Sequence, residues 1–200
     1  MISIIDYGLG NVLAFRNVYG RLNIPVGVAR CAADLAQSTK LILPGVGAFD
    51  HAMARLEASG MRGPIEEMVL QRKLPVLGIC VGMQMLAAAS EEGSRQGLAW
   101  IDGKVRRFRG AALALPHMGW NDVKPVGEAK LFAGMETDAR FYFLHSYYFE
   151  CHHGSDVLAR ADYGGNFGCA VKRGNVYGVQ FHPEKSHHWG QQLLKNFAEL

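Results

Sequence analysis

Three short apolar runs in the first half of the chain constrain its fold more than any other feature. They cover residues 2–5, 41–43 and 76–79 and are almost free of polar side chains. A strand that carries apolar residues on both faces is buried on both faces, as in a parallel sheet. We therefore expect these runs to form strands of a mostly parallel sheet.

Helical patterns separate and follow the three runs. Apolar residues between positions 12 and 22 recur at helical spacing along one face. Residues 49–56 and 65–70 look like two further helices, and residues 81–89, rich in Ala, Met and Leu, favour a fourth. This alternation of strand and helix predicts an α/β sheet with helices on both faces.

After about residue 101 the pattern changes to short strand-like segments. They cover residues 104–108, 140–144, 157–161, 169–172 and 176–181. An amphipathic helix around residues 189–197 closes the chain. With 200 residues and no internal repeat or linker, the sequence predicts a single α/β domain over residues 1–200, in which helices flank a mostly parallel mixed sheet.

The composition narrows the class of protein. A net charge of +3 is too small to favour nucleic-acid binding, and no apolar run approaches the roughly 20 residues of a membrane span. The first residues resemble a strand and not a signal peptide. Four scattered cysteines without CxxC spacing indicate free thiols. We expect a cytoplasmic protein.

Cys80 lies where the third apolar run meets the fourth expected helix, within the sequence GICVG at residues 78–82. This G-x-nucleophile-x-G pattern is typical of a nucleophile elbow, here with cysteine in place of serine. The sharp turn strains the nucleophile's backbone, and the glycines let neighbouring backbone approach closely. A helix N-terminus favours the thiolate. Cys80 is therefore a candidate nucleophile, whereas the other three cysteines are expected to be structural.

His182 and Glu184 form a second candidate group, within the sequence VQFHPE at residues 179–184. Pro183 biases His182 toward an extended conformation, in which residues i and i+2 point to the same side. Glu184 would then hold the imidazole and stabilise its charged form, as the acid of a catalytic triad does. We expect this pair at an edge of the sheet. A solvent-facing His–Glu pair without a catalytic role is the alternative.

Six motifs spread over the whole chain give it a resemblance to a known enzyme family. They are IIDYGLGN at 4–11, LPGVGAF at 43–49, GICVGMQ at 78–84, PHMGWN at 116–121, FLHSYY at 143–148 and GVQFHPEKS at 178–186. Together they resemble the triad-type, class I glutamine amidotransferases, and more narrowly the glutaminase subunits of imidazole glycerol phosphate synthase in histidine biosynthesis. The chain departs from the family's usual residues at Val81, commonly leucine, and at His187-His188, commonly small or acidic.

The resemblance implies a flavodoxin-like fold and a Cys80–His182–Glu184 triad. Such a triad hydrolyses glutamine to glutamate and ammonia through a thioester intermediate. The intermediate needs an oxyanion hole, for which we expect the backbone N–H of Val81 and a second donor from Val46 or Gly47. Without the resemblance, the glycines around Val46 would indicate no more than a turn.

The resemblance also assigns residues to the substrate. Gly45 belongs to the same loop as the expected oxyanion donors, and Gln84 falls one helical turn after Cys80. We expect both to contact glutamine, together with the backbone of His145, Ser146 and Tyr147. The side chain of His145 is expected to be a structural contact and not a second base.

A partner subunit is implied as well, because 200 residues without a phosphate-binding signature leave no place for the synthase reaction. In the family this partner is a cyclase of the (β/α)8-barrel fold, which receives the ammonia within a heterodimer. We expect Asn11, Met118, Trp120, Tyr142 and Lys185 at the interface, with Trp120 in a loop. The resemblance implies no cofactor.

Two other functions compete with this interpretation. The first is a different class I glutaminase, such as that of pyridoxal phosphate synthase, and the second is a non-catalytic flavodoxin-like binding module. Cys151-His152-His153 could suggest a metal site, but the sequence offers no second ligand pair at metal spacing. We expect an exposed loop there and no bound metal.

Overall fold

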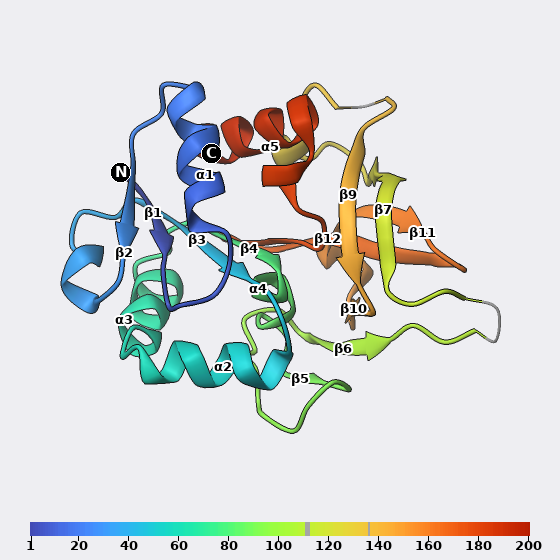
Figure 1. Ribbon diagram of the computed structural model, residues 1–200, viewed down its shortest axis with the longest axis horizontal. Helices are drawn as coiled ribbons and strands as arrows, with labels where there is room; N and C mark the ends of the chain where they lie inside the picture. Colours follow the sequence, from blue (N-terminus) through green and yellow to red (C-terminus); the bar gives the residue numbers. More distant parts are fainter. Residues whose placement is uncertain (111–112, 136) are drawn as a thin grey trace.

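The computed structural model describes residues 1–110, 113–135 and 137–200. Within these ranges, a central eight-stranded sheet has the order β2-β1-β3-β4-β13-β12-β11-β8 (Figure 1). The first five strands pair in parallel and the remaining pairs are antiparallel. In that order the strands are β2 (Val26–Ala29), β1 (Ile2–Ile5), β3 (Lys40–Gly45), β4 (Val76–Cys80), β13 (Val176–Val179), β12 (Asn166–Arg173), β11 (Val157–Asp162) and β8 (Lys124–Pro125).

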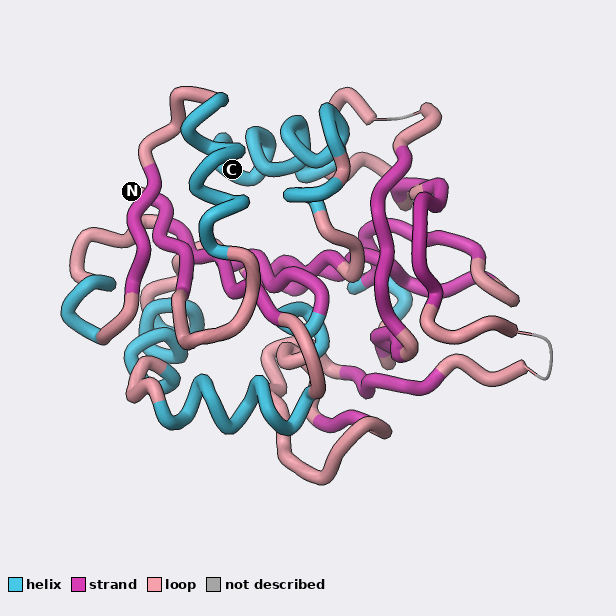
Figure 2. Tube along the Cα trace, in the orientation of Figure 1, coloured by secondary structure: helices cyan, strands magenta, loops and turns pink. Residues whose placement is uncertain are grey.

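Helices cover the parallel half of this sheet on both faces (Figure 2). Helices α1 (Val12–Arg21) and α5 (His187–Glu199) lie together on one side. On the other side lie α2 (Phe49–Ala58) and α3 (Arg62–Glu66), which a π-helical turn η2 (Glu67–Gln71) extends. The mostly parallel mixed sheet flanked by helices is confirmed. Among the described residues, none of the helices combines the length and the apolar character needed to cross a bilayer.

Two smaller sheets stand beside the antiparallel half. One has the order β10-β6-β5, with β10 (Tyr147–Cys151), β6 (Gly103–Arg107) and β5 (Ala89–Ser90). The other is an antiparallel pair of β7 (His117–Asp122) and β9 (Arg140–His145). Trp120 thus lies in a strand, so the expectation of a loop was wrong. The remaining short helical turns are η1 (Ala32–Leu35), η3 (Lys130–Phe132), η4 (Gly154–Asp156) and η5 (Pro183–Lys185).

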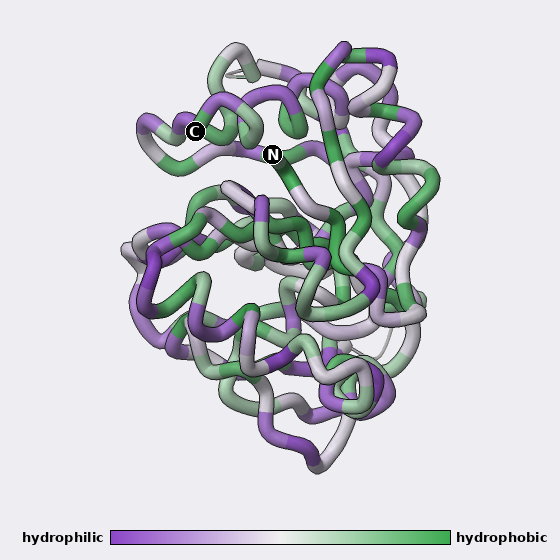
Figure 3. The backbone as a smooth tube through the Cα atoms, turned by 90° about the vertical axis from the view of Figure 1, so that its left-hand side faces the viewer, coloured by the Kyte–Doolittle hydropathy of each residue, from purple (hydrophilic) through white to green (hydrophobic). Residues whose placement is uncertain are grey.

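The three apolar runs form the middle of the core, as expected. All residues of β1, β4 and β13 are buried, and so are five of the six residues of β3. The central strands are largely hydrophobic along their length, while hydrophilic residues gather in the outer turns (Figure 3). Burial of apolar side chains on both faces of these strands is the main force that fixes their order.

The helix expected over residues 81–89 is much shorter, since α4 ends at Gln84 (Val81–Gln84) and β5 begins at Ala89. Backbone N–H groups of residues 97–101 donate to the carbonyl oxygens of Met85, Leu86, Ala87 and Ala88. Those carbonyls would otherwise accept the next bonds of the helix. Helix propensity alone therefore gave the wrong length, because a distant segment competes for the same acceptors.

Candidate active site

Cys80 ends strand β4 and begins helix α4 with a strained backbone. Its φ of +56° and ψ of −114° lie outside the regions that L-residues normally adopt. Such a conformation is typical of a nucleophile elbow, and the strained turn expected at Cys80 is present. The turn places Cys80 at the carboxyl end of a central strand, where ligands of open α/β sheets bind.

The glycines around Cys80 are required by close backbone packing. A Cβ atom on Gly82 would collide with the carbonyl oxygen of Leu43, and one on Gly45 with the backbone nitrogen of Gly82. A Cβ on Gly78 would lie 2.6 Å from the carbonyl oxygen of Gly82. The elbow therefore packs directly against the end of β3, where Gly45 is the register partner of Cys80.

His182 and Glu184 lie just beyond strand β13, which pairs with β4 in the middle of the sheet. The Nδ1 atom of His182 is 2.9 Å from Oε1 of Glu184, and both side chains are almost fully buried. The expected contact is present, but the expected sheet edge was wrong. The backbone conformation that brings the two side chains together also differs from the expected one, because Glu184 belongs to the turn η5 and not to an extended segment.

Cys80 and Glu184 both affect the pKa of His182. Burial by itself lowers the pKa of His182, but hydrogen bonds to the Cys80 thiol and to Glu184, and the negative charges of both, outweigh it. Together they raise the pKa of His182 to about 10. Since Glu184 occupies Nδ1, the Nε2 atom is the one that remains for the thiol. A thiol, an imidazole and a carboxylate thus form one connected series.

A cavity of about 280 Å³ opens over Cys80 and His182. Its wall includes most residues for which sequence analysis predicted a role in catalysis or substrate binding. The lining residues are Val46, Gly47, Cys80, Val81, Gln84, Glu92, Pro116, Leu144, His145, Ser146, Tyr147, His182 and Lys185. Of the predicted substrate and oxyanion residues, Gly45 alone is absent from this wall, because it lies under the elbow.

The candidate oxyanion residues lie on both sides of the thiol. Val81 follows Cys80 directly, and the Val46–Gly47 segment follows the neighbouring strand β3. Gly47 has a φ of +82°, and a Cβ atom there would meet no heavy atom within 4 Å. Backbone conformation, and not space, therefore requires glycine at this position.

Two residues of this site were not predicted. Gln180 is completely buried, and its Nε2 atom points at Cys80 Sγ over 3.8 Å. It precedes His182 by two residues, so the same spacing argument that paired His182 with Glu184 could have identified it. Glu92 lines the cavity and accepts a hydrogen bond from the backbone nitrogen of Phe49 at 2.8 Å. We find no signal in the sequence that singles out Glu92.

The β7–β9 pair carries an exposed apolar surface next to the cavity. Met118 is 65% exposed and Trp120 is 41% exposed, which excludes core packing for Trp120. Their cross-strand partners are Leu144 and Tyr142, and the rings of Trp120 and Tyr142 meet edge to face. Lys185 Nζ lies 5.7 Å from the centre of the Tyr142 ring. Four of the predicted interface residues therefore belong to one face.

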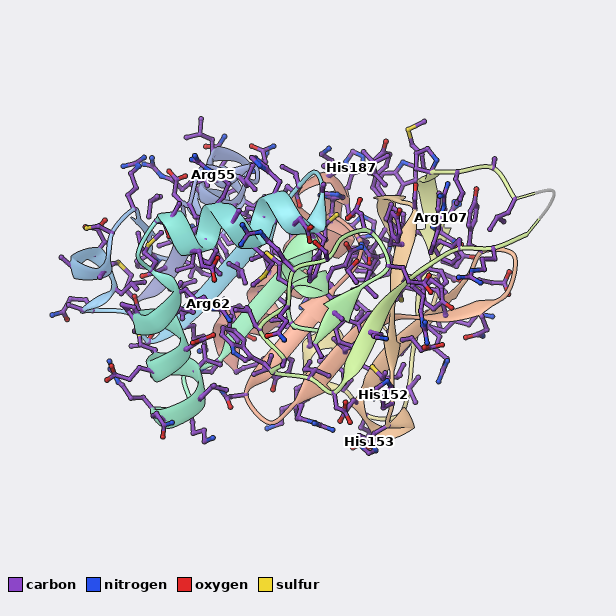
Figure 4. All side chains as sticks on the ribbon, turned by 90° about the horizontal axis from the view of Figure 1, so that it is seen from below. Arg55, Arg62, Arg107, His152, His153 and His187 are labelled. Atoms are coloured by element: carbon purple, nitrogen blue, oxygen red, sulfur yellow. The ribbon has the colours of Figure 1, made fainter. Side chains whose placement is uncertain are left out.

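The fifth predicted interface residue, Asn11, has a structural role in addition. Its side chain accepts a hydrogen bond from Ala14 and caps helix α1. Cys151 ends β10, while His152 and His153 follow in an exposed turn, at the outer edge of the molecule (Figure 4). Both histidines contact the carboxylate of Asp102.

Sequence comparison places the chain among known proteins. Residues 3–200 match the family described as glutamine amidotransferase class-I. The chain is 64% identical to a protein of Bdellovibrio bacteriovorus, 52% identical to one of Leptospira interrogans and 47% identical to one of Pseudomonas aeruginosa. Each comparison covers the full length of both proteins. All three relatives are named imidazole glycerol phosphate synthase subunit HisH, the third as HisH 2.

Solved structures agree on the fold. A crystal structure described as glutamine amidotransferase has a TM-score of 0.76 at 22% identity and covers 99% of this chain and 97% of its own. The PurLQS structure from Thermotoga maritima has a TM-score of 0.72 at 18% identity, with coverage of 99% and 97%. The full-length match to the family and the identity of up to 64% to these relatives show that this chain belongs to the class-I glutamine amidotransferases, within the group of imidazole glycerol phosphate synthase subunits called HisH.

Proposed function

We propose that this chain hydrolyses glutamine to glutamate and ammonia, with Cys80 as the nucleophile. One observation carries the proposal: a strained cysteine at the end of β4 shares a cavity wall with His182, whose Nδ1 atom lies 2.9 Å from the buried carboxylate of Glu184. A thiolate next to an imidazolium is a strong nucleophile whose neighbour can both give and take a proton.

The reaction has two halves. The Cys80 thiolate attacks the side-chain amide carbon of glutamine, so that a C–S bond forms and the carbonyl oxygen becomes an oxyanion. The imidazolium of His182 gives its proton to the nitrogen, the C–N bond breaks, and ammonia leaves a thioester. Neutral His182 then removes a proton from water, the water oxygen attacks the thioester, and the C–S bond breaks to release glutamate.

Three groups of residues support these steps. Glu184 keeps His182 in the Nδ1–H tautomer and stabilises the imidazolium. The backbone N–H of Val81 and one from Val46 or Gly47 would donate to the oxyanion. Because Gly47 occupies a positive φ without steric contact, the peptide between Val46 and Gly47 can turn toward the cavity at low cost.

The substrate would lie in the cavity between Gln84 and the Ser146–Tyr147 backbone. Gln84 Nε2 already donates to the carbonyl of Tyr147 and to Gln180, which leaves its Oε1 atom available to a ligand. The backbone of His145 and the buried Gly45 complete the proposed substrate region. Ammonia released there must remain unprotonated, since ammonium has no free electron pair for the next reaction.

The acceptor reaction would belong to a cyclase partner, because the relatives are named as subunits of imidazole glycerol phosphate synthase. We assign Met118, Trp120, Tyr142 and Lys185 to the face on which the partner docks, and we include Asn11 because of the family resemblance. Met118 and Trp120 are exposed apolar side chains beside the cavity, because Leu144, the cross-strand partner of Met118, belongs to the cavity wall. Interfaces with an aromatic anchor have such exposed apolar groups. Docking there would close the cavity and give ammonia a dry path to the acceptor.

The proposal is tested by measuring ammonia release from glutamine, with and without the cognate cyclase. Wild type should release ammonia rapidly only in the complex. Cys80→Ala should abolish glutamine-dependent synthesis but leave synthesis from an added ammonium salt intact. Residual glutaminase activity in that variant would overturn the role of Cys80. Stimulation by a different synthase, and not by the cyclase, would overturn the assigned partner.

A further inference from the structure

A continuous series of hydrogen bonds runs from strand β7 to the Cys80 thiol. At its outer end, Asn121 Nδ2 lies 3.2 Å from Nε2 of His117. His117 Nδ1 lies 2.9 Å from Nε2 of His145, whose Nδ1 atom lies 2.7 Å from the carbonyl oxygen of Tyr147. The two histidines are buried, so the bond between them is shielded from water.

The same carbonyl connects the histidines to the active site. Tyr147 O also accepts a hydrogen bond from Gln84 Nε2 at 3.2 Å. Gln84 Nε2 donates its second hydrogen to Gln180 Oε1 at 3.1 Å, and Gln180 Nε2 points at Cys80 Sγ over 3.8 Å. The thiol and the nearest amides are thus fixed by a series that begins on another sheet.

The groups at the two ends of this series determine which atom donates and which accepts in each of the outer hydrogen bonds. A backbone carbonyl only accepts, so His145 must carry its proton on Nδ1 and must accept at Nε2. His117 must then donate from Nδ1 and accept at Nε2 from the Asn121 amide. The Asn121 amide is held in that orientation, because it also donates to Asp162 O at 2.8 Å and accepts from Asp122 N at 2.8 Å.

Both imidazoles are suited to this fixed arrangement because they stay neutral. Burial lowers the pKa of His117 to about 4 and that of His145 to about 3. Aromatic rings restrain His117 in addition, with Tyr163 stacked at 3.9 Å and Phe143 at 4.8 Å between ring centres. His117 therefore cannot act as a proton carrier near neutral pH, and its contribution has to be one of position.

We propose that His117 and Asn121 are positioning residues, which hold the Tyr147 carbonyl and through it the Gln84 and Gln180 amides against the Cys80 thiol. With Gln180 donating to sulfur, the series would favour the thiolate and fix the substrate-side amide of Gln84. The effect on hydrolysis rests on the function proposed above, whereas the effect on the thiol does not.

The outer end of this series lies behind the proposed docking face. Along β7, His117 and Asn121 point toward the molecule, while Met118 and Trp120 between them point outward. A partner that presses on Met118 and Trp120 would move the backbone that carries both positioning residues. The series therefore gives docking a physical connection to Cys80 through residues behind the docking face and residues of the cavity wall.

Nuclear magnetic resonance can test the bond directions directly. Two-bond ¹⁵N–¹H correlations of the imidazole rings distinguish the Nδ1–H tautomer from the Nε2–H tautomer. In the isolated chain, His117 and His145 should both be neutral at pH 7 and protonated on Nδ1. Asn121→Asp places an acceptor opposite His117 Nε2, so His117 should become doubly protonated. An Nε2–H tautomer at His145 in wild type would overturn the proposal.

Alkylation tests the effect on the thiol without glutamine or a partner. Iodoacetamide labelling is followed at the Cys80 peptide by mass spectrometry, since Cys31 is also free and exposed. His117→Phe keeps the ring stacking but removes both hydrogen bonds, and should slow labelling roughly three- to tenfold, as loss of one hydrogen bond predicts. His117→Asn keeps a donor at the Nδ1 position and should stay close to wild type.

Control variants distinguish a positioning role from a general loss of folding, and a separate outcome distinguishes it from the proposed glutaminase function. His153→Phe replaces an exposed histidine and should label at the wild-type rate. Glutaminase turnover of the complex should fall in His117→Phe by a factor similar to that of labelling. If wild type shows no glutaminase activity, the proposed function fails, while the labelling and tautomer results still decide the positioning role. Wild-type labelling and turnover in folded His117→Phe would overturn it.

Discussion

Glu184 holds His182 through a single contact of 2.9 Å between Oε1 and Nδ1, inside a region almost closed to solvent. Among the described side chains, the second oxygen of Glu184 has no hydrogen-bond partner. The imidazole of His182 is therefore the main group that interacts with the carboxylate charge of Glu184. In such an environment the two groups stabilise each other's charged forms strongly.

Replacement of Glu184 by Gln should lower turnover strongly while the fold is retained. The amide can keep a hydrogen bond to Nδ1, but it cannot stabilise the imidazolium. His182→Ala should cost at least as much, and the double variant should be no worse than His182→Ala alone, because the two residues act as a unit. Steady-state ammonia release by the complex measures this. Additive losses in the double variant would show that the residues act independently.

The raised pKa of His182 makes stability depend on pH. Its folded-state pKa of about 10 lies above the ordinary value of 6.5, so the folded chain holds this proton more tightly than the unfolded chain. That stabilisation is complete below about pH 6.5 and is lost as pH rises through about 10. Urea unfolding between these limits should show a decline in wild type and a smaller decline in Glu184→Gln. Equal declines in the two proteins would show that Glu184 does not contribute to the raised pKa of His182.

Gly47→Val should impair hydrolysis far more than glutamine binding. Valine strongly disfavours the positive φ of this position, although its side chain would have space. Gly60→Val is a matched control, since Gly60 also has a positive φ and an open Cβ position. Each variant should lose roughly 1–2 kcal/mol of stability, but only Gly47→Val should lose turnover. Unchanged turnover in Gly47→Val would exclude this loop from the oxyanion hole.

Tyr7→Phe should reduce activity in addition to stability. The Tyr7 hydroxyl donates to the carbonyl of Pro44 at 2.7 Å, directly before the candidate oxyanion loop. Tyr19→Phe removes a comparable buried bond, to the carbonyl of Leu194 at 3.1 Å, away from the site. Both variants should lose about 1 kcal/mol of unfolding free energy, and turnover should fall only in Tyr7→Phe. Equal turnover in the two variants would argue against an anchoring role for Tyr7.

Trp120→Ala should weaken the complex with the cyclase by roughly 2 kcal/mol or more, as is typical of an aromatic hot spot. The isolated chain should remain folded, because the side chain is 41% exposed. Val126→Ala, which truncates another exposed apolar residue beyond β8, should leave binding unchanged. Titration of the cyclase with both variants measures this. Normal affinity in Trp120→Ala would place the interface elsewhere.

The central strands could be predicted because their signal is local. Residues of β1, β3 and β4 are buried on both faces, and continuous apolar runs report that directly. The elbow at Cys80 could also be predicted from the sequence. Its flanking glycines are required because backbone atoms of the elbow itself and of strand β3 approach them closely. In these segments the local preference and the tertiary structure agree.

Other elements depend on contacts that no short window of sequence contains. Helix α4 ends early because residues 97–101 donate to the carbonyl groups of residues 85–88, which follow it. Trp120 was expected in a loop but lies in strand β7, whose large apolar residues Met118 and Trp120 lie on the solvent side. Glu92 reaches the cavity from a loop, through a bond to Phe49 that only the fold creates.

The position of β13 has a consequence for how the molecule is made. This strand comes from the last part of the chain, yet it lies between β4 and β12 at the centre of the sheet. Chains are synthesised from the N-terminus and fold as segments become available. A nascent chain that already contains Cys80 still lacks the strand that carries His182 and Glu184 to it. Cys80 therefore meets His182 only when the sheet is completed, so a molecule that hydrolyses glutamine as proposed would do so only after this late strand has joined the sheet.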